Sequence, residues 1–493
     1  MDSKISEMTL YNQSLALLTD LYQLTMVYGY WKSGCAEQQA VFHLNFRKAP
    51  FQGGFAIAAG LETAIHFIQS FRFSKSDLAY LATLTGREEK PLFEPAFLEF
   101  LSTFSCSCEI DAMPEGSLVF PYEPLIRVKG PLWQAQLLES PLLNIINFQT
   151  LIATKAARMC LAAASEPVIE FGMRRAQGID GAISASRAAF IGGCTATSDV
   201  LAGKLFAIPV RGTHGHSWVM AFESEIDAFF RFAENFPREC VLLVDTYDSV
   251  AGVKKAIHVA KELQATGFRL AGVRLDSGDL AALSIAIRKI LDAEGFFATE
   301  IMASNELDEY LIRDLKQQGA KITVWGVGTH LVTGKDQAAL DGIYKLAAIQ
   351  DRQGEWHYKL KLSETTAKVT NPGILQVKRW FDGQFYVGDA IYDERMGSAS
   401  PCLVTGIADP DREVRLETGE AKDVLVPIFR EGRCVYQLPA LQEIQNATKR
   451  ELSRLPDSVK RFVNPQLYFV GLEHRLHQKK LELIKRAQSV FRN

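Results

Sequence analysis

Short apolar segments recur through the middle of this chain, and most are followed by a stretch with helical periodicity. Successive segments begin roughly 20–30 residues apart, the length of one strand–helix unit. They are apolar throughout rather than alternating, as expected of parallel strands that helices cover on both faces. We therefore predict parallel strands at residues 168–171, 188–191, 206–209, 241–244, 270–273, 300–303 and 322–325.

This repetition predicts an α/β fold built on an irregular (β/α) barrel, and a doubly wound open sheet is the alternative. The chain has 493 residues, whereas a single hydrophobic core extends over roughly 250–300. We expect the barrel at residues 135–345, after an N-terminal α+β domain at 1–134. A small C-terminal α+β region at 346–493 is expected to pack on both.

Local patterns support the two flanking regions. Residues 21–28 have helical spacing with Asp20 as the N-cap, and residues 40–47 alternate like a strand. A long helix is predicted over residues 136–164, which Pro141 could break. Short strands and charged helices are expected in the last region, at 356–360, 383–387, 447–455 and 472–491.

Composition excludes several classes of protein. A net charge of −3 without a run of Lys and Arg argues against a nucleic-acid or membrane-surface partner. The start, Met1–Glu7, lacks the regions of a signal peptide, and no apolar run reaches the roughly 18 residues of a membrane span. The eight cysteines are scattered, so we expect reduced thiols and a cytoplasmic protein.

Polar, charged and glycine-rich segments follow the predicted strands. In a barrel the carboxyl ends of the strands meet at one rim and carry the catalytic groups, so this distribution indicates an enzyme. Glycine-rich turns let backbone N–H groups approach an anion. These segments include Arg174-Arg175, Gly192-Gly193, Gly212–Trp218, Asp245-Thr246, Arg274–Asp279, Ser304-Asn305 and Gly326–Thr329.

Two acids at one strand end suggest a cation site. Asp276 and Asp279 could hold Mg²⁺ together with phosphate oxygens, because Mg²⁺ usually takes one or two carboxylates and leaves its other positions to substrate and water. The alternative for Asp279 is a capping role at the helix that begins at Leu280. Arg274, directly before these acids, offers a planar cation for carboxylate or phosphate oxygens.

Two histidines, His214 and His216, lie two residues apart at another strand end. Such a pair is either a metal site or one nucleophile or acid–base group beside a bystander. A metal site would need further ligands, which the sequence does not supply convincingly. A metal-dependent barrel hydrolase that uses both histidines is therefore the rival hypothesis.

These segments, taken in order, resemble the nicotinate phosphoribosyltransferase family of type II phosphoribosyltransferases. The similarity runs from Leu18–Met26 to about Lys345. It implies that nicotinate and 5-phosphoribosyl 1-pyrophosphate react to nicotinate mononucleotide and pyrophosphate, the first step of NAD synthesis from nicotinate. It also implies coupled hydrolysis of ATP through a phosphohistidine, and a homodimer. Nicotinamide or quinolinate as the acceptor is the alternative within this class.

The resemblance also implies roles for individual residues. The phosphohistidine falls on His216, in a Gly-Thr-x-x-His-Ser pattern, and His214 occupies a variable position. Nicotinate contacts fall on Tyr22, Arg174, Thr213 and Arg274, with Arg175 as an alternative to Arg174. The phosphoribosyl site includes Thr329. From the residues themselves we add Ser304, Asn305, Gly326 and Gly328 to the phosphate contacts. The expected catalytic set is His216, Arg274 and Asp276, with Mg²⁺ on Asp276 and Asp279.

Overall fold

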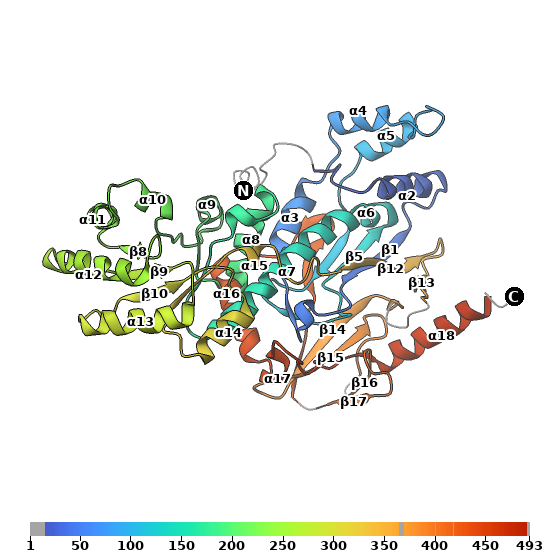
Figure 1. Cartoon of the computed structure of the whole chain (residues 1–493). Coiled ribbons are helices and arrows are strands. Elements are labelled where there is room, and N and C mark those ends of the chain that lie inside the picture. The colour runs from blue at the N-terminus through green and yellow to red at the C-terminus, as the bar shows by residue number, and fades with distance from the viewer. Residues whose placement is uncertain (1–14, 364–368, 400, 418, 491–493) are drawn as a thin grey trace. The chain divides into compact units, whose positions relative to one another are not determined.

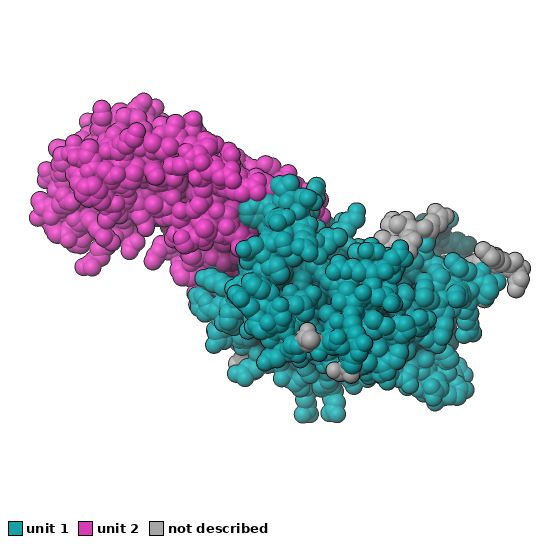
Figure 2. All heavy atoms as spheres, turned by 90° about the horizontal axis from the view of Figure 1, so that it is seen from below, with its two compact units in different colours: residues 1–151, 339–493 teal, residues 152–338 magenta. Residues whose placement is uncertain are grey.

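The computed structural model describes residues 15–363, 369–399, 401–417 and 419–490 of the chain (Figure 1). Met1–Glu7, on which the expected lack of a signal peptide rests, lies outside them. The chain forms two compact units, one of residues 1–151 and 339–493 and the other of residues 152–338 (Figure 2). No helix in the described part of the chain combines the length and the apolar character that a membrane crossing requires.

The unit of residues 152–338 is built on a parallel sheet of six strands in the order β7-β6-β11-β10-β9-β8. Except for β7 and β8, strands that follow one another in sequence are neighbours, and the last strand, β11, also pairs with the first, β6. This is the order of a barrel that is open between β7 and β8. The irregular barrel is therefore confirmed over the doubly wound sheet. The strands are β6 (Val168–Glu170), β7 (Ala196–Thr197), β8 (Val241–Leu243), β9 (Gly272–Leu275), β10 (Glu300–Ala303) and β11 (Val324–Val327).

Two of the seven predicted strands are wrong. Residues 188–191 belong to helix α8 (Ile179–Gly192), because a short buried apolar run rich in alanine fits a covered helix as well as a strand. Residues 206–209 form no strand: α9 (Val200–Phe206) ends there, and the chain touches the sheet only at the bridge between Val210 and Thr197. The barrel is open next to this segment, between β7 and β8.

Helices return the chain between the strands of this unit. Five of them begin at a residue whose side chain accepts backbone N–H groups of the first turn: Asp199, Ser224, Asp248, Asp279 and Asp308. These caps satisfy donors that a helix otherwise leaves unpaired. The helices are α10 (His216–Met220), α11 (Glu225–Asn235), α12 (Ser249–Ala265), α13 (Leu280–Ala293), α14 (Glu309–Gln317) and α15 (Thr329–Val332).

The predicted long helix is divided before Pro141 rather than at it. Helix α6 (Leu132–Leu137) ends first, and α7 (Glu139–Ala163) runs without interruption. Pro141 lies in the first turn of α7, where the missing N–H costs no helical hydrogen bond.

In the other unit, strands from both ends of the chain share one sheet in the order β13-β12-β1-β5-β3-β19-β20. β1 pairs with β12 on one side and β5 on the other, both antiparallel. The segments before residue 151 and after residue 339 therefore form one folded body. Its strands are β1 (Gln39–Asn45), β3 (Glu109–Ala112), β5 (Ile126–Pro131), β12 (Ile343–Gln350), β13 (Trp356–Tyr358), β19 (Val426–Arg430) and β20 (Arg433–Cys434).

A second six-stranded sheet of this unit has the order β17-β16-β21-β15-β14-β18. It consists of β14 (Leu375–Phe381), β15 (Tyr386–Asp393), β16 (Cys402–Gly406), β17 (Glu413–Leu416), β18 (Glu420–Asp423) and β21 (Val470–Glu473). The longer helices of this unit outside α6 and α7 are α2 (Leu21–Lys32), α3 (Leu61–Ser70), α4 (Lys75–Thr83), α5 (Pro95–Ser102), α16 (Leu441–Ser453) and α18 (His474–Val490). Asp20 occupies the N-cap position of α2, but its carboxylate accepts from Ser140 Oγ rather than from the helix.

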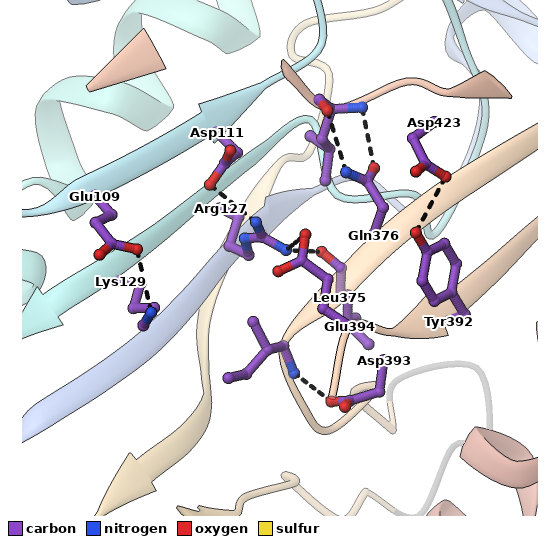
Figure 3. A network of polar contacts seen from close by, with 12 residues as sticks. Glu109, Asp111, Arg127, Lys129, Leu375, Gln376, Tyr392, Asp393, Glu394 and Asp423 are labelled. Carbon is purple, nitrogen blue, oxygen red and sulfur yellow. Dashed lines mark hydrogen bonds and ion pairs between the residues drawn. The ribbon is translucent and has the colours of Figure 1, made fainter. Parts of the chain in front are cut away.

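A buried arginine ties the two sheets of this unit together. Arg127 on β5 donates to Asp111 on β3 and to the carbonyl oxygen of Leu375 on β14, each at 2.9 Å (Figure 3). Its Nη1 also lies 2.8 Å from a carboxylate oxygen of Glu394. The Arg127 side chain is 5% exposed, so it is compensated by partners rather than by water.

We expect Arg127→Met to lower the free energy of unfolding by about 3 kcal/mol, because the buried carboxylate of Asp111 loses a counter-ion. Lys129→Met on the same strand is the matched control. Its ion pair with Glu109 is about a third to half exposed, so we expect a loss below about 1 kcal/mol. Urea unfolding measures both changes, and equal losses would contradict the structural role of Arg127.

Candidate active site

Polar side chains meet where β9 and β10 end. Arg274 Nε donates to Ser304 Oγ at 2.9 Å, and Arg274 Nη2 donates to Asp276 Oδ1 at 3.1 Å. Ser304 Oγ donates to the same oxygen of Asp276 at 2.5 Å. Two donors thus hold Asp276 Oδ1 and leave Oδ2 free to face another group. The Arg274 guanidinium also lies 5.5 Å from the centre of the Phe171 ring, a distance at which a cation and an aromatic face attract.

His216 faces this cluster from the first turn of α10. Its Nε2 lies 3.8 Å from Asp276 Oδ2, and its Nδ1 lies 3.1 Å from the hydroxyl oxygen of Thr246. When Nδ1 carries the proton and donates to Thr246, Nε2 keeps its lone pair. The side chain is 42% exposed, so Nε2 can reach a ligand. The structure therefore brings together His216, Arg274 and Asp276, the predicted catalytic set.

His214 has a different environment. Its Nε2 accepts the backbone N–H of Leu243 at 3.2 Å, and the ring packs edge-on against Phe232. Burial lowers the pKa of His214 to about 4, so the ring is neutral near pH 7. Since Nε2 already accepts a hydrogen bond, His214 is poorly placed to ligate a metal with His216, which weakens the hydrolase hypothesis.

The depressed pKa of His214 predicts a pH-dependent stability. A histidine that binds its proton only below pH 4 in the folded state, but near 6.5 when unfolded, stabilises the protein above pH 6.5 and loses that contribution as the pH falls toward 4. His214→Gln cannot titrate there. We expect the stability difference between the wild type and this variant to shrink by about 3 kcal/mol between pH 7 and pH 4. Urea unfolding at several pH values measures it, and a constant difference would contradict a buried neutral ring.

Asp245 follows a predicted strand, but its residue type and position alone assigned it no role. Its Oδ2 accepts the backbone N–H of Asp276 at 2.8 Å and the hydroxyl of Ser277 at 2.6 Å. Its Oδ1 is buried and has no hydrogen-bond partner within the described part of the chain. A buried carboxylate oxygen without a donor is a favourable place for a cation. The available signal was its position directly after the strand at 241–244.

Asp279 is the N-cap residue of helix α13. Its Oδ1 accepts the N–H of Ala282 at 3.0 Å and caps α13, as the alternative for this residue proposed. Across the residues that the structure describes, no group of three or more His, Cys, Asp or Glu side chains could hold a metal ion. A magnesium ion that takes most of its ligands from substrate and water needs fewer.

The predicted phosphate contacts lie near the ends of β10 and β11. Thr329 begins α15, and its hydroxyl donates to Glu306 at 3.2 Å. Glu306 also lies 2.7 Å from His330, and both Asn305 and Glu306 have a positive φ. Gly328 is the N-cap of α15, whereas Gly326 lies within β11, where a Cβ would come within 2.8 Å of the Phe171 ring. Ser304 belongs to the Arg274 cluster.

The remaining predicted contacts are more scattered. Arg174 and Arg175 lie in a short 3₁₀ turn (Met173–Arg175) after β6, and both side chains are exposed. The hydroxyl of Thr213 donates to the carbonyl oxygen of Val241. Tyr22 lies on α2 in the other unit, 49% exposed.

The expectation of an anion site at Gly192-Gly193 is wrong. Gly192 is the last residue of α8, and Gly193 is its C-cap with a φ of +120°. The N–H of Gly193 donates to the carbonyl oxygen of Phe190 and is therefore not available to an anion. These glycines end a helix and let it pack closely, since a Cβ on Gly192 would lie 2.3 Å from the carbonyl oxygen of Ala153.

A parallel barrel whose strand ends hold a histidine, an arginine and carboxylates is the architecture of an enzyme with one catalytic rim. Three family models match the chain: the nicotinate phosphoribosyltransferase (NAPRTase) N-terminal domain at residues 17–147, the NAPRTase family at 167–357 and the C-terminal domain at 374–480. The chain belongs to the nicotinate phosphoribosyltransferase family.

Individual relatives agree with this assignment. A nicotinate phosphoribosyltransferase of Bacillus subtilis is 43% identical over 97% of both chains. The crystal structure of the human nicotinic acid phosphoribosyltransferase has a TM-score of 0.82 at 31% identity, covering 94% of this chain and 99% of that one. A nicotinate-nucleotide pyrophosphorylase from Pyrococcus furiosus shares the fold, with a TM-score of 0.68 at 21% identity over 90% and 99% of the two chains.

Proposed function

We propose that this protein transfers the phosphoribosyl group of 5-phosphoribosyl 1-pyrophosphate to nicotinate, and that it couples this transfer to hydrolysis of ATP through a phosphate on His216. The observation that carries the proposal is the position of His216 Nε2, exposed and 3.8 Å from Asp276, inside the cluster of Arg274 and Ser304. The family and its relatives support the choice of reaction.

In the transfer step, the lone pair of the pyridine nitrogen forms a bond to C1 of the ribose. The bond from C1 to the pyrophosphate oxygen breaks, and its electrons leave with pyrophosphate. The acceptor nitrogen is already nucleophilic, so the protein's main tasks are to position it and to stabilise the charge that develops. Arg274 is suited to the leaving group or to the carboxylate of nicotinate. The exposed Arg174 and Arg175 offer further guanidinium groups for the same oxygens.

A magnesium ion fits the carboxylates of this site. Asp276 offers Oδ2, and Asp245 offers the buried Oδ1 that lacks a donor within the described chain. Asp279, the second ligand that the sequence suggested, already caps α13 through one oxygen, so Asp245 is the better partner. Mg²⁺ bound there would neutralise part of the charge of the departing pyrophosphate.

In the ATP step, His216 Nε2 forms a bond to the γ-phosphorus and the bond to the ADP oxygen breaks. Water later cleaves the N–P bond and releases phosphate. Thr246 holds the ring through Nδ1, which keeps the Nε2 lone pair available. A phosphate at this place adds negative charge beside Arg274 and can order the neighbouring loops.

A homodimer in the cytoplasm is part of the proposal. Several large apolar side chains that follow the strands are exposed, including Met173 at 51%, Ile179 at 62% and Met220 at 67%. A second copy could cover them. All eight cysteines are free, which suits a reducing compartment.

The direct test supplies the purified protein with 5-phosphoribosyl 1-pyrophosphate, Mg²⁺ and one acceptor at a time. We expect nicotinate mononucleotide and pyrophosphate with nicotinate, and a faster reaction when ATP is present. Nicotinamide and quinolinate are expected to react far more slowly, because the exposed arginines suit one ring carboxylate. A preference for either would overturn the proposed acceptor.

A further inference from the structure

A groove in the unit of residues 1–151 and 339–493 lies outside the site described above. It has a volume of about 660 Å³ and is lined by residues of the edge strand β13 and the helix α18. Figure 1 labels both elements. Sites for small molecules typically have about 300–1,000 Å³. The groove shares no residue with the cluster around His216.

The charged side chains that line this groove are all cations among the described residues. Among the described residues that line it, four are Lys or Arg and none is Asp or Glu: Lys359, Arg395, Lys479 and Arg486. Lys479 pairs with Glu482 at 3.1 Å. Lys359 and Arg486 have no ion pair within the described chain. Burial raises the pKa of the Tyr358 hydroxyl, which also interacts with Asp393, which raises its pKa further, and with Arg395, which lowers it. An anionic ligand would complement these cations.

Aromatic faces lie beside these cations. Trp356 and Tyr358 are two residues apart on β13, so they share one face of the strand. Both are partly buried against the core cluster of Val41, Ala348 and Ile374, which holds the rings in place. Flat aromatic ligands stack on such rings.

The opposite wall is one face of α18. Lys479, Leu483, Arg486 and Ala487 line the groove and follow the spacing of a single helix face. Lys485, next to Arg486, does not line it. The helix thus presents cations and apolar contact to the same space.

We propose that this groove binds a nucleoside phosphate. The base lies against Trp356 and Tyr358, and the phosphate oxygens are bound by Arg486, Arg395 and Lys359. Arginine binds phosphate with two parallel hydrogen bonds, and an aromatic ring accepts any base. The ligand class follows from the pairing of cations with aromatic faces, since either feature alone would suit a simpler ligand.

Photolabelling of the full chain with 8-azidoadenosine 5′-triphosphate tests this, followed by digestion and mass spectrometry to locate the label. At a probe concentration below saturation, we expect label on the β13 segment around Trp356. Arg486→Ala should reduce that label about tenfold, since one charge-assisted contact is lost. Lys485→Ala, an exposed cation one position away on α18, should leave it unchanged. Label only at other segments, or equal label in both variants, would overturn the proposal.

Competition separates the two parts of the ligand. Unlabelled ATP should displace the probe from the β13 segment at a concentration about tenfold lower than inorganic triphosphate does, because the base adds stacking. Equal displacement by the two would show a site for phosphate alone, and the assignment of a nucleoside ligand would be wrong. Neither arm uses the proposed transfer reaction, so the result is independent of it.

Discussion

His216→Ala is expected to remove the stimulation by ATP completely. The variant lacks Nε2, the atom that faces Asp276 at 3.8 Å and that would carry the phosphate. Its turnover of nicotinate in the presence of ATP should fall to the rate measured without ATP. Steady-state assays with and without ATP measure the change, together with the ratio of ADP to nicotinate mononucleotide formed.

The neighbouring histidine is the control for this variant. His214 holds the N–H of Leu243 and packs against aromatic rings, so His214→Ala should cost stability and retain stimulation by ATP below its melting temperature. Loss of stimulation in His214→Ala with retention in His216→Ala would reverse the roles of the two residues.

Asp276→Asn is expected to lower kcat by about 10³-fold at an unchanged fold. The substitution removes the negative charge between Arg274 and His216 and takes away a ligand of the proposed magnesium site. The asparagine amide has nearly the same size as the aspartate carboxylate, so a fall in kcat measures the effect of the lost negative charge. Initial rates over a range of Mg²⁺ concentrations measure it, and we also expect a weaker apparent affinity for Mg²⁺.

Asp279→Asn, three residues away, is the matched comparison. Asparagine caps helices as well as aspartate does, so α13 keeps its N-cap and the rate should stay within a few-fold of the wild type. A large loss in Asp279→Asn at unchanged stability would return Asp279 to the metal site, and a small loss in Asp276→Asn would remove Asp276 from it.

The sequence predicted the fold where periodicity carries the information. Buried strands such as 241–243 and 300–303 stand where the apolar runs predicted them. It failed at 188–191, because a short apolar run has no periodicity that separates a strand from a covered helix. The shared sheet of β1 and β12 was also not predicted, since pairing between strands so far apart in sequence leaves no local pattern.

The sequence predicted which residues belong to the site, but not the hydrogen bonds and contacts between them. Position after a predicted strand identified Arg274, Asp276 and His216 as candidates. The structure brings them together, although the strand expected before His216 does not form. His214 differs from His216 because its Nε2 accepts the backbone N–H of Leu243. The sequence could not show this contact, since the two segments lie about 30 residues apart. Asp245 became a candidate only through its bonds to the backbone of Asp276 and the hydroxyl of Ser277.

Labelling with [γ-³²P]ATP shows whether His216 carries the phosphate. Wild type and His216→Ala are incubated with Mg²⁺ and the labelled nucleotide, and the label is followed after acid and alkali treatment. We expect a label on the wild type that is stable in alkali and lost in acid, as a phosphohistidine requires. We expect no such label on His216→Ala. Nicotinate with 5-phosphoribosyl 1-pyrophosphate should speed its release. Acid-labile label of equal amount on His216→Ala would contradict a phosphate on His216.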